Sequence, residues 1–153
     1  MTLAMSPFEQ VQAQLARQKW AVDARDADAL RPLYTADSAQ VIYAGGPDGR
    51  KEIVRNHGRD EILAGIIAGW ARTAATWYPG QMLHQIGSVL TEPADGGAIR
   101  CRSYCSFLSL DSSGVPHLKG YAAYDDRWAL AEGEWLLAYR ETTMYGYAPP
   151  GRP

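Results

Sequence analysis

The order of hydrophobic periodicities along the chain predicts an α+β fold. Apolar residues recur at helical spacing in the first half of the sequence, and they alternate with a period of two from about residue 81 onward. Short segments rich in Gly, Asp and Ser separate the alternating runs, as hairpin turns do. Helices followed by an antiparallel meander indicate three N-terminal helices packed on one face of a curved, mainly antiparallel sheet.

The first helix is expected from Ser6 to about Arg25. Ser6 is a candidate N-cap, Pro7 suits the first helical position, and Glu9 stands where a capping box places its glutamate. Apolar side chains that share one arc of this helix are Phe8, Val11, Leu15 and Val22. Polar side chains that fall within the wider arc of the same face are Gln12, Lys19 and Asp23.

Two more helices and five strands are expected after the first helix. Residues 26–38 predict a second short helix, and residues 39–46 predict a strand that runs into the glycine-rich loop GGPDG. Residues 58–73 predict a third helix, with acidic residues in its first turn. The strands expected in the meander are residues 81–92, 97–110, 117–131 and 134–147. Residues 146–153 are expected to form an extended tail.

Length and composition limit the class of protein further. A chain of 153 residues has the size of one domain, so we expect a single domain over residues 1–153 with its core at about 8–145. Hydrophobic residues make up 46% and charged residues 21%, which is typical of a soluble globular protein. The net charge of −2 provides no basic surface for phosphates, so nucleic-acid binding is not expected.

The sequence lacks the marks of a membrane or exported protein. No apolar stretch reaches the ~18 residues of a membrane span. The first residues, MTLAMSPFEQVQAQ, lack a basic segment followed by a long apolar run. We therefore expect a cytoplasmic protein that does not bind a membrane.

A histidine interrupts the apolar face of the first meander strand. His84 shares that face with Met82 and Ile86, and Asp23 is the candidate partner for its imidazole. A carboxylate bonded to one ring nitrogen fixes the tautomer and stabilises the imidazolium, so the pair can act as a general base. Two other interpretations stay open: His84 can be a core or interface residue bonded to a backbone carbonyl, and Asp23 can cap a helix.

The cysteines and the other histidines provide no metal site and no disulfide. Cys101 and Cys105 lie in one predicted strand, about 13 Å apart, which is beyond the reach of a disulfide. Two cysteines alone also make a poor zinc site. His57 and His117 are not spaced as metal ligands with His84, so no metal and no cofactor are expected.

Four stretches of the chain carry a family pattern: AVDARDADALRPLYTADSAQVIYAG, GRDEI, LHQIGSV and YAAYDDRWALAEGEWLLAYRE. Together they resemble the SnoaL-like branch of the nuclear-transport-factor-2-like superfamily, which includes scytalone dehydratase and hexachlorocyclohexane dehydrochlorinase. Residues that match the family's ordered motifs are Asp23, Asp26, Tyr34, Gly58, Arg59, His84, Tyr124, Asp126, Gly133 and Trp135. The resemblance covers about residues 8–145. It implies a cone-shaped, cystatin-like α+β barrel with the helices on the concave face of the sheet.

The resemblance also implies a site. In the dehydratase and dehydrochlorinase members, a helix Asp and a strand His form a catalytic dyad at the bottom of an apolar cavity, and these roles pass to Asp23 and His84. Tyr43 lies at the strand end where scytalone dehydratase carries a tyrosine that polarises the substrate. The chain departs from that enzyme at Val22, where the enzyme has tyrosine, and it offers no counterpart of the second active-site histidine.

The leading hypothesis is a cofactor-independent lyase of the dehydratase kind. It would abstract a proton from a small, apolar, cyclic substrate through Asp23 and His84. Residues expected to bind this substrate in the pocket wall are Tyr43, Trp20, Trp70, Met82, Tyr104 and Tyr121. The alternatives are a non-catalytic ligand-binding or subunit module of the same fold, and a polyketide-cyclase-like or ketosteroid-isomerase-like isomerase. Because one face of the sheet is left uncovered, a homo-oligomer, dimer or trimer, is also expected.

Overall fold

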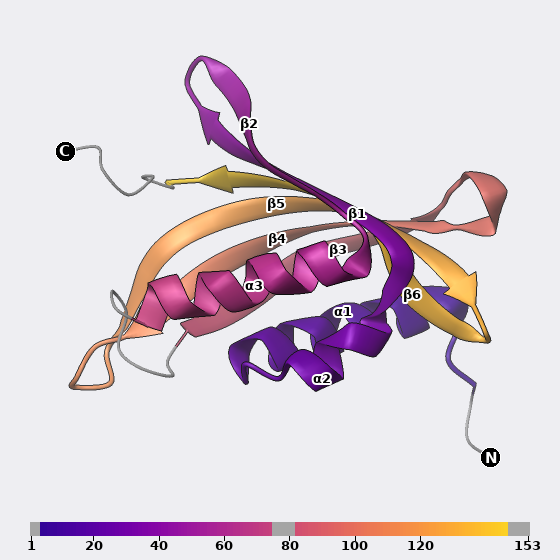
Figure 1. Cartoon of the computed structure of the whole chain (residues 1–153), viewed down its shortest axis with the longest axis horizontal. Coiled ribbons are helices and arrows are strands. Elements are labelled where there is room, and N and C mark those ends of the chain that lie inside the picture. Colours follow the sequence, from indigo (N-terminus) through magenta and orange to yellow (C-terminus); the bar gives the residue numbers. More distant parts are fainter. Residues whose placement is uncertain (1–3, 75–81, 147–153) are drawn as a thin grey trace.

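The computed structural model describes residues 4–74 and 82–146, and it shows helices cradled by a strongly curved sheet (Figure 1). The helices are α1 (Pro7–Asp23), α2 (Ala27–Leu30) and α3 (Arg59–Ala74). The strands are β1 (Tyr34–Gly46), β2 (Gly49–His57), β3 (Met82–Pro93), β4 (Ile99–Leu110), β5 (Pro116–Ala131) and β6 (Glu134–Tyr145). The tail expected at residues 146–153 lies, apart from its first residue, outside the described part of the chain.

The six strands form one sheet in the order β2-β1-β6-β5-β4-β3. All neighbouring pairs are antiparallel except β1 and β6, which run parallel. The sheet does not close, because β2 and β3 remain at its two edges. The predicted α+β fold, with helices on the concave face, is therefore confirmed, and the expected barrel is an open cone.

Two elements differ from the sequence-based expectation. Strand β2, which follows the turn at the GGPDG loop, is not predicted from the sequence. It is exposed over nearly its whole length and therefore lacks the alternation of a half-buried strand. As a result α3 follows a β1–β2 hairpin in the chain. The expected helix over residues 26–38 ends at Leu30, since Pro32 has no N–H to donate and its ring would clash with a continuing helix. Tyr34 consequently begins β1 instead of lying in a helix.

The ends of α1 are fixed by local hydrogen bonds. The backbone N–H of Glu9 donates to Ser6 Oγ at 3.3 Å, and the N–H of Ser6 donates to Glu9 Oε2 at 2.6 Å, which completes the predicted capping box. At the other end, Asp26 caps α2 by accepting from the N–H of Ala29 at 2.9 Å. This turn leaves Asp23 as the last residue of α1, where its side chain can point toward the sheet.

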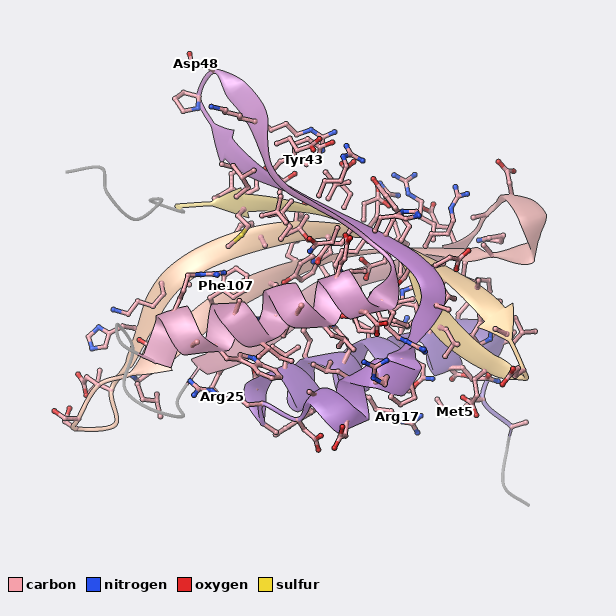
Figure 2. The ribbon with its side chains drawn as sticks, in the orientation of Figure 1. Met5, Arg17, Arg25, Tyr43, Asp48 and Phe107 are labelled. Atoms are coloured by element: carbon pink, nitrogen blue, oxygen red, sulfur yellow. The ribbon has the colours of Figure 1, made fainter. Side chains whose placement is uncertain are left out.

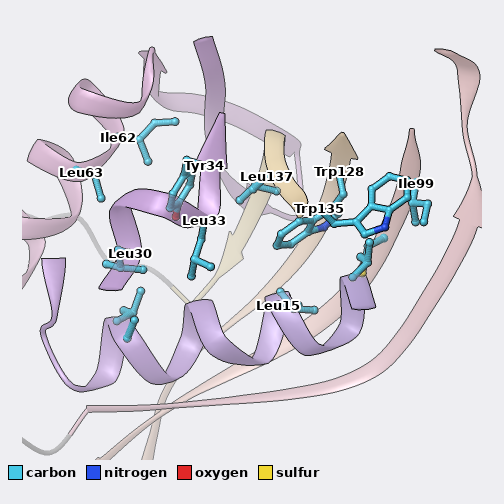
Figure 3. Packing of buried hydrophobic residues seen from close by; sticks show 14 of the residues in the cluster. Leu15, Leu30, Leu33, Tyr34, Ile62, Leu63, Ile99, Trp128, Trp135 and Leu137 are labelled. Atoms are coloured by element: carbon cyan, nitrogen blue, oxygen red, sulfur yellow. The ribbon is translucent and has the colours of Figure 1, made fainter. Parts of the chain in front are cut away.

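The hydrophobic core fills the space between the helices and the concave face of the sheet (Figure 3). Trp128 on β5 is fully buried, and Trp135 on β6 is almost so. Helical residues that pack against these strands include Val11, Leu15, Leu30, Ile62 and Leu63. Burying each large apolar side chain contributes about 1.5–3 kcal/mol, so this cluster fixes the position of α1 above the sheet.

A buried polar network lies beside this core. Arg140 on β6 donates two hydrogen bonds to Asp126 on β5, at 2.7 and 2.6 Å, and a third to Gln18 on α1 at 3.0 Å. Gln18 in turn donates to the hydroxyl of Tyr34 at 2.7 Å. The network ties α1 to β1, β5 and β6. Its helical member, Gln18, directly precedes Lys19, and Lys19 lies on the same face of α1 as Asp23.

Candidate active site

Asp23 and His84 meet where the C-terminal end of α1 packs on β3. His84 Nδ1 lies 2.5 Å from Asp23 Oδ1, and the backbone N–H of His84 donates to Asp23 Oδ2 at 2.9 Å. The two side chains, of His84 and Asp23, are only 8% and 14% exposed. The contact expected from the sequence is therefore present, and both carboxylate oxygens are used.

The place of β3 at the edge of the sheet explains the second of these bonds. His84 pairs with Phe107 on β4, and its own N–H points away from β4. Because no further strand in the described part of the chain pairs with β3, that N–H is free to reach Asp23. The ring of Phe107 also meets the imidazole edge to face, with centroids 5.0 Å apart, and so restricts its rotation.

This geometry leaves one imidazole nitrogen available for chemistry. The bond to Asp23 places the proton of the neutral ring on Nδ1, so Nε2 carries the lone pair. Burial lowers the pKa of His84 below its usual value, and nearby Lys19 lowers it further, against the opposite effect of Asp23. The imidazole is therefore neutral near pH 7, as a general base must be.

The dyad lines an open pocket of about 490 Å³. The residues around it are Ala16, Lys19, Trp20, Asp23, Leu83, His84, Gln85, Ile86 and Leu108. Most of this surface is apolar, as expected. A second depression, of about 520 Å³, lies next to Arg17 and Leu33.

Of the residues expected in the pocket wall, Trp20 lies there and remains 77% exposed at the rim. Tyr43 lies instead on the β1–β2 hairpin, which carries Asp48 at its tip and projects away from α1 (Figure 2). Its ring stacks on Arg50 with 4.2 Å between guanidinium and centroid. Trp70 is buried in the core between α3 and the sheet and does not line this pocket.

Tyr104 and Tyr121 are on the opposite face of the sheet from the dyad. Their rings stack on each other with centroids 5.5 Å apart. Tyr104 alternates with the buried Cys105, which faces the helices, so it points outward. The same alternation turns Tyr124 inward on β5. The side chain of Met82 lies outside the described part of the structure.

Lys19 is the pocket residue whose importance the sequence did not reveal. It is 6% exposed, and its Nζ lies 4.1 Å from the centroid of the Tyr124 ring. In the sequence it is an interruption of the apolar stripe, which usually marks a residue whose charged end reaches water. The available signal was its position four residues before Asp23, because this spacing puts both on one helix face.

The cysteines form no disulfide, as predicted, and both are buried. Burial raises the pKa of the Cys101 thiol to about 12, so this thiol is unreactive. Within residues 4–74 and 82–146, no three side chains of His, Cys, Asp or Glu come together as metal ligands. In the same residues, no helix is long and apolar enough to cross a membrane.

The arrangement of helices inside an open, curved sheet is shared with several solved structures. ActVI-ORFA from Streptomyces coelicolor superimposes with a TM-score of 0.72 at 21% identity, over 91% of this chain and 98% of that one. Aln2 from another Streptomyces strain gives a TM-score of 0.71 at 19% identity, over 92% and 94%. A Novosphingobium aromaticivorans protein provisionally assigned as a scytalone dehydratase gives 0.66 at 16% identity, over 95% and 93%.

These likenesses define the class of fold as cystatin-like, of the nuclear-transport-factor-2-like type. Residues 6–141 match the sequence model of the SnoaL-like domain. The chain therefore belongs to the SnoaL-like domain family, which confirms the resemblance found in the sequence. None of the curated proteins matches the sequence.

Proposed function

We propose that this protein is a cofactor-independent lyase of the dehydratase kind, in which His84 abstracts a proton from a small, mostly apolar, cyclic substrate. The observation that carries the proposal is the bond from His84 Nδ1 to Asp23 at the wall of an apolar pocket. It gives a neutral imidazole with a defined tautomer and a carboxylate ready to stabilise the imidazolium. Membership of the SnoaL-like family and the likeness to the Novosphingobium protein support this interpretation.

The chemistry needs two proton transfers. Nε2 of His84 takes a proton from a substrate carbon, and the electron pair of that C–H bond forms the new double bond as a hydroxyl leaves from the neighbouring carbon. The imidazolium, held by Asp23, then gives its proton to the departing oxygen, so that water is the second product. General-base help of this kind contributes about 10²- to 10⁴-fold to the rate. Return of the proton to another carbon instead would make the enzyme an isomerase.

The shape of the site indicates the size of the substrate. A pocket of about 490 Å³ suits a small molecule with one or two rings. The apolar side chains of Leu83, Ile86 and Leu108 would contact the hydrocarbon part of such a ring system. Trp20 stands at the rim, where its exposed indole can cover a bound ring.

The test starts with a thermal-shift screen of small cyclic alcohols and ketones, since a saturating ligand raises the apparent stability. Binders are then assayed for turnover. Asp23→Asn should lower kcat by about 10²-fold or more, because the amide would donate to Nδ1 and move the ring proton to Nε2. His84→Ala should abolish turnover, with the fold of both variants intact by circular dichroism.

The matched control is His117→Ala. His117 Nε2 bonds to Asp111 Oδ2 at 2.8 Å in an exposed Asp–His pair at the β4–β5 turn, so its loss should leave turnover unchanged. Unchanged turnover in Asp23→Asn and His84→Ala would refute the proposal. Ligand binding without turnover, together with a loss of stability in both variants, would favour the non-catalytic module instead.

A further inference from the structure

Lys19 brings a buried amine to the pocket that the dyad lines. It lies one helical turn before Asp23 on α1, and only 6% of its surface is exposed. Lysine side chains usually bury the hydrocarbon stem and keep the ammonium in water. Here the stem and the amine both lie under the helix, beside the apolar wall of the pocket.

The amine has no anionic partner in the described part of the structure. No hydrogen bond or ion pair among these residues reaches Nζ, which lies over the face of the Tyr124 ring. The two neighbouring carboxylates are already used, since Asp23 bonds to His84 and Asp126 bonds to Arg140. A protonated Lys19 therefore has no bonded anion among the described residues, and the charge of Asp23, whose partner His84 is neutral, balances it only through space.

Every element packed around Lys19 bears on its charge. Burial first, and then the charge of Arg140 on β6, bring the pKa of Lys19 down to about 7. Cys105 on β4, Asp126 on β5 and Asp23 on α1 act in the opposite direction. His84 on β3 is neutral and adds no charge of its own. An anion that reached Nζ would accept a hydrogen bond from the amine and favour its protonated form.

We propose that Lys19 makes the pocket selective for a ligand that carries one negative charge on oxygen, such as a ring compound with a carboxylate, and that Nζ binds this oxygen. The inference rests on the proposed function for the identity of the pocket and adds the chemical class of the substrate. The apolar wall would hold the ring, Lys19 would hold the anionic group, and Nε2 of His84 would face a carbon between them.

The experiment compares two probes of similar shape, cyclohexanecarboxylate and the neutral cyclohexanecarboxamide, by isothermal titration calorimetry. The wild-type protein should bind the carboxylate about tenfold or more tightly, because a hydrogen bond to a charged group is worth more than a neutral one. Repeating the titration at about pH 8.5 in buffers of different ionisation enthalpy counts protons, and carboxylate binding should take up close to one. The amide should take up none.

The decisive variant is Lys19→Met, which keeps the length of the stem and removes the charge. It should bind both probes with affinities within about twofold and take up no proton. Lys19→Gln serves the same purpose if the first variant does not fold. The control Lys119→Met removes an exposed lysine of β5 and should keep the carboxylate preference. Equal binding of the probes by wild type, or an unchanged preference in both Lys19 variants, would overturn the inference.

The outcomes also separate this inference from the proposed function. His84→Ala should keep the preference for the carboxylate, whatever it does to turnover. Loss of turnover in His84→Ala with no effect of Lys19→Met on probe binding refutes only the role of Lys19. A carboxylate preference that depends on Lys19, with turnover intact in His84→Ala, refutes only the dyad.

Discussion

Two adjacent aspartates of β5 form the same kind of ion pair on opposite faces of the sheet. Asp126 points toward the helices and pairs with Arg140, and both side chains are almost inaccessible, at 0% and 4% exposure. Asp125 points outward and pairs with Arg100, with both side chains about two-fifths exposed. Each arginine makes two hydrogen bonds to its carboxylate. The two ion pairs therefore have the same charged groups and the same number of hydrogen bonds, and they differ in their exposure to water.

The comparison shows that an unpaired charge destabilises the fold more on the concave face of the sheet than on the outer face. On the outer face, water solvates each ion, and the pairs can be broken with little loss of stability. On the concave face a charge without a partner is costly. Asp126 and Arg140 are paired there, whereas Lys19 has no bonded anion among the described residues and Asp23 bonds to a neutral imidazole. The buried charge of Lys19 beside a pocket has this effect only on the concave face, because water solvates the charges of the outer face.

The largest expected effect comes from breaking the inner pair. Asp126→Ala leaves the guanidinium of Arg140 buried without its carboxylate and should lower the free energy of unfolding by about 3–5 kcal/mol. Asp125→Ala should lower it by ~1 kcal/mol or less. Urea denaturation of the two variants measures both values. Equal losses would mean that the two faces do not differ as the exposures indicate.

Removing the unpaired charge of Lys19 should raise the free energy of unfolding instead of lowering it. The folded-state pKa of Lys19 is lowered from 10.5 to about 7, so between these values the unfolded chain binds a proton that the folded protein does not. The free energy of unfolding should therefore rise with pH across this window. Lys19→Met should be more stable than wild type at pH 7, by about 1–3 kcal/mol, with a gap that narrows toward pH 10. Urea denaturation at several pH values, with Lys119→Met as control, measures it.

Acidification should weaken the concave face through His84. Its folded-state pKa lies below the ordinary 6.5, so the folded protein binds fewer protons than the unfolded chain as the pH falls through this value. Stability should decrease below about pH 6.5. In His84→Phe this part of the pH dependence should vanish, whereas His117→Ala should retain it. Thermal melts between about pH 5 and 8 distinguish the two variants.

The smallest effect on stability is expected on the outer face. Tyr104, Tyr121 and Tyr145 form a row of contacting rings there, and two of these side chains are nearly half exposed. We propose that this row packs against a second copy of the chain in a dimer or trimer. Tyr121→Glu should then give a monomer in light scattering with little change in thermal stability. A wild-type protein that stays monomeric at high concentration would contradict the proposal.

The same division between faces explains what could be read from the sequence. The Asp23–His84 contact was predictable, because the apolar period of α1 and the family motifs both point to it. Alternation along β4 and β5 separates two sets of residues, but it does not reveal which set is concave, and Tyr104 and Tyr121 were expected on the wrong face. Lys19 was missed because burial of a charge depends on tertiary packing, which no local pattern encodes.

The second hydrogen bond of Asp23 has a consequence for the solution behaviour of the protein. An edge strand with unpaired N–H groups is a template on which another chain can add, and β3 is such an edge. By accepting from the backbone of His84, the carboxylate occupies one of these groups. We therefore expect the side chain that would orient the base to block strand addition at this point of the edge as well, and substitutions that shorten Asp23 to free the N–H of His84 for another chain.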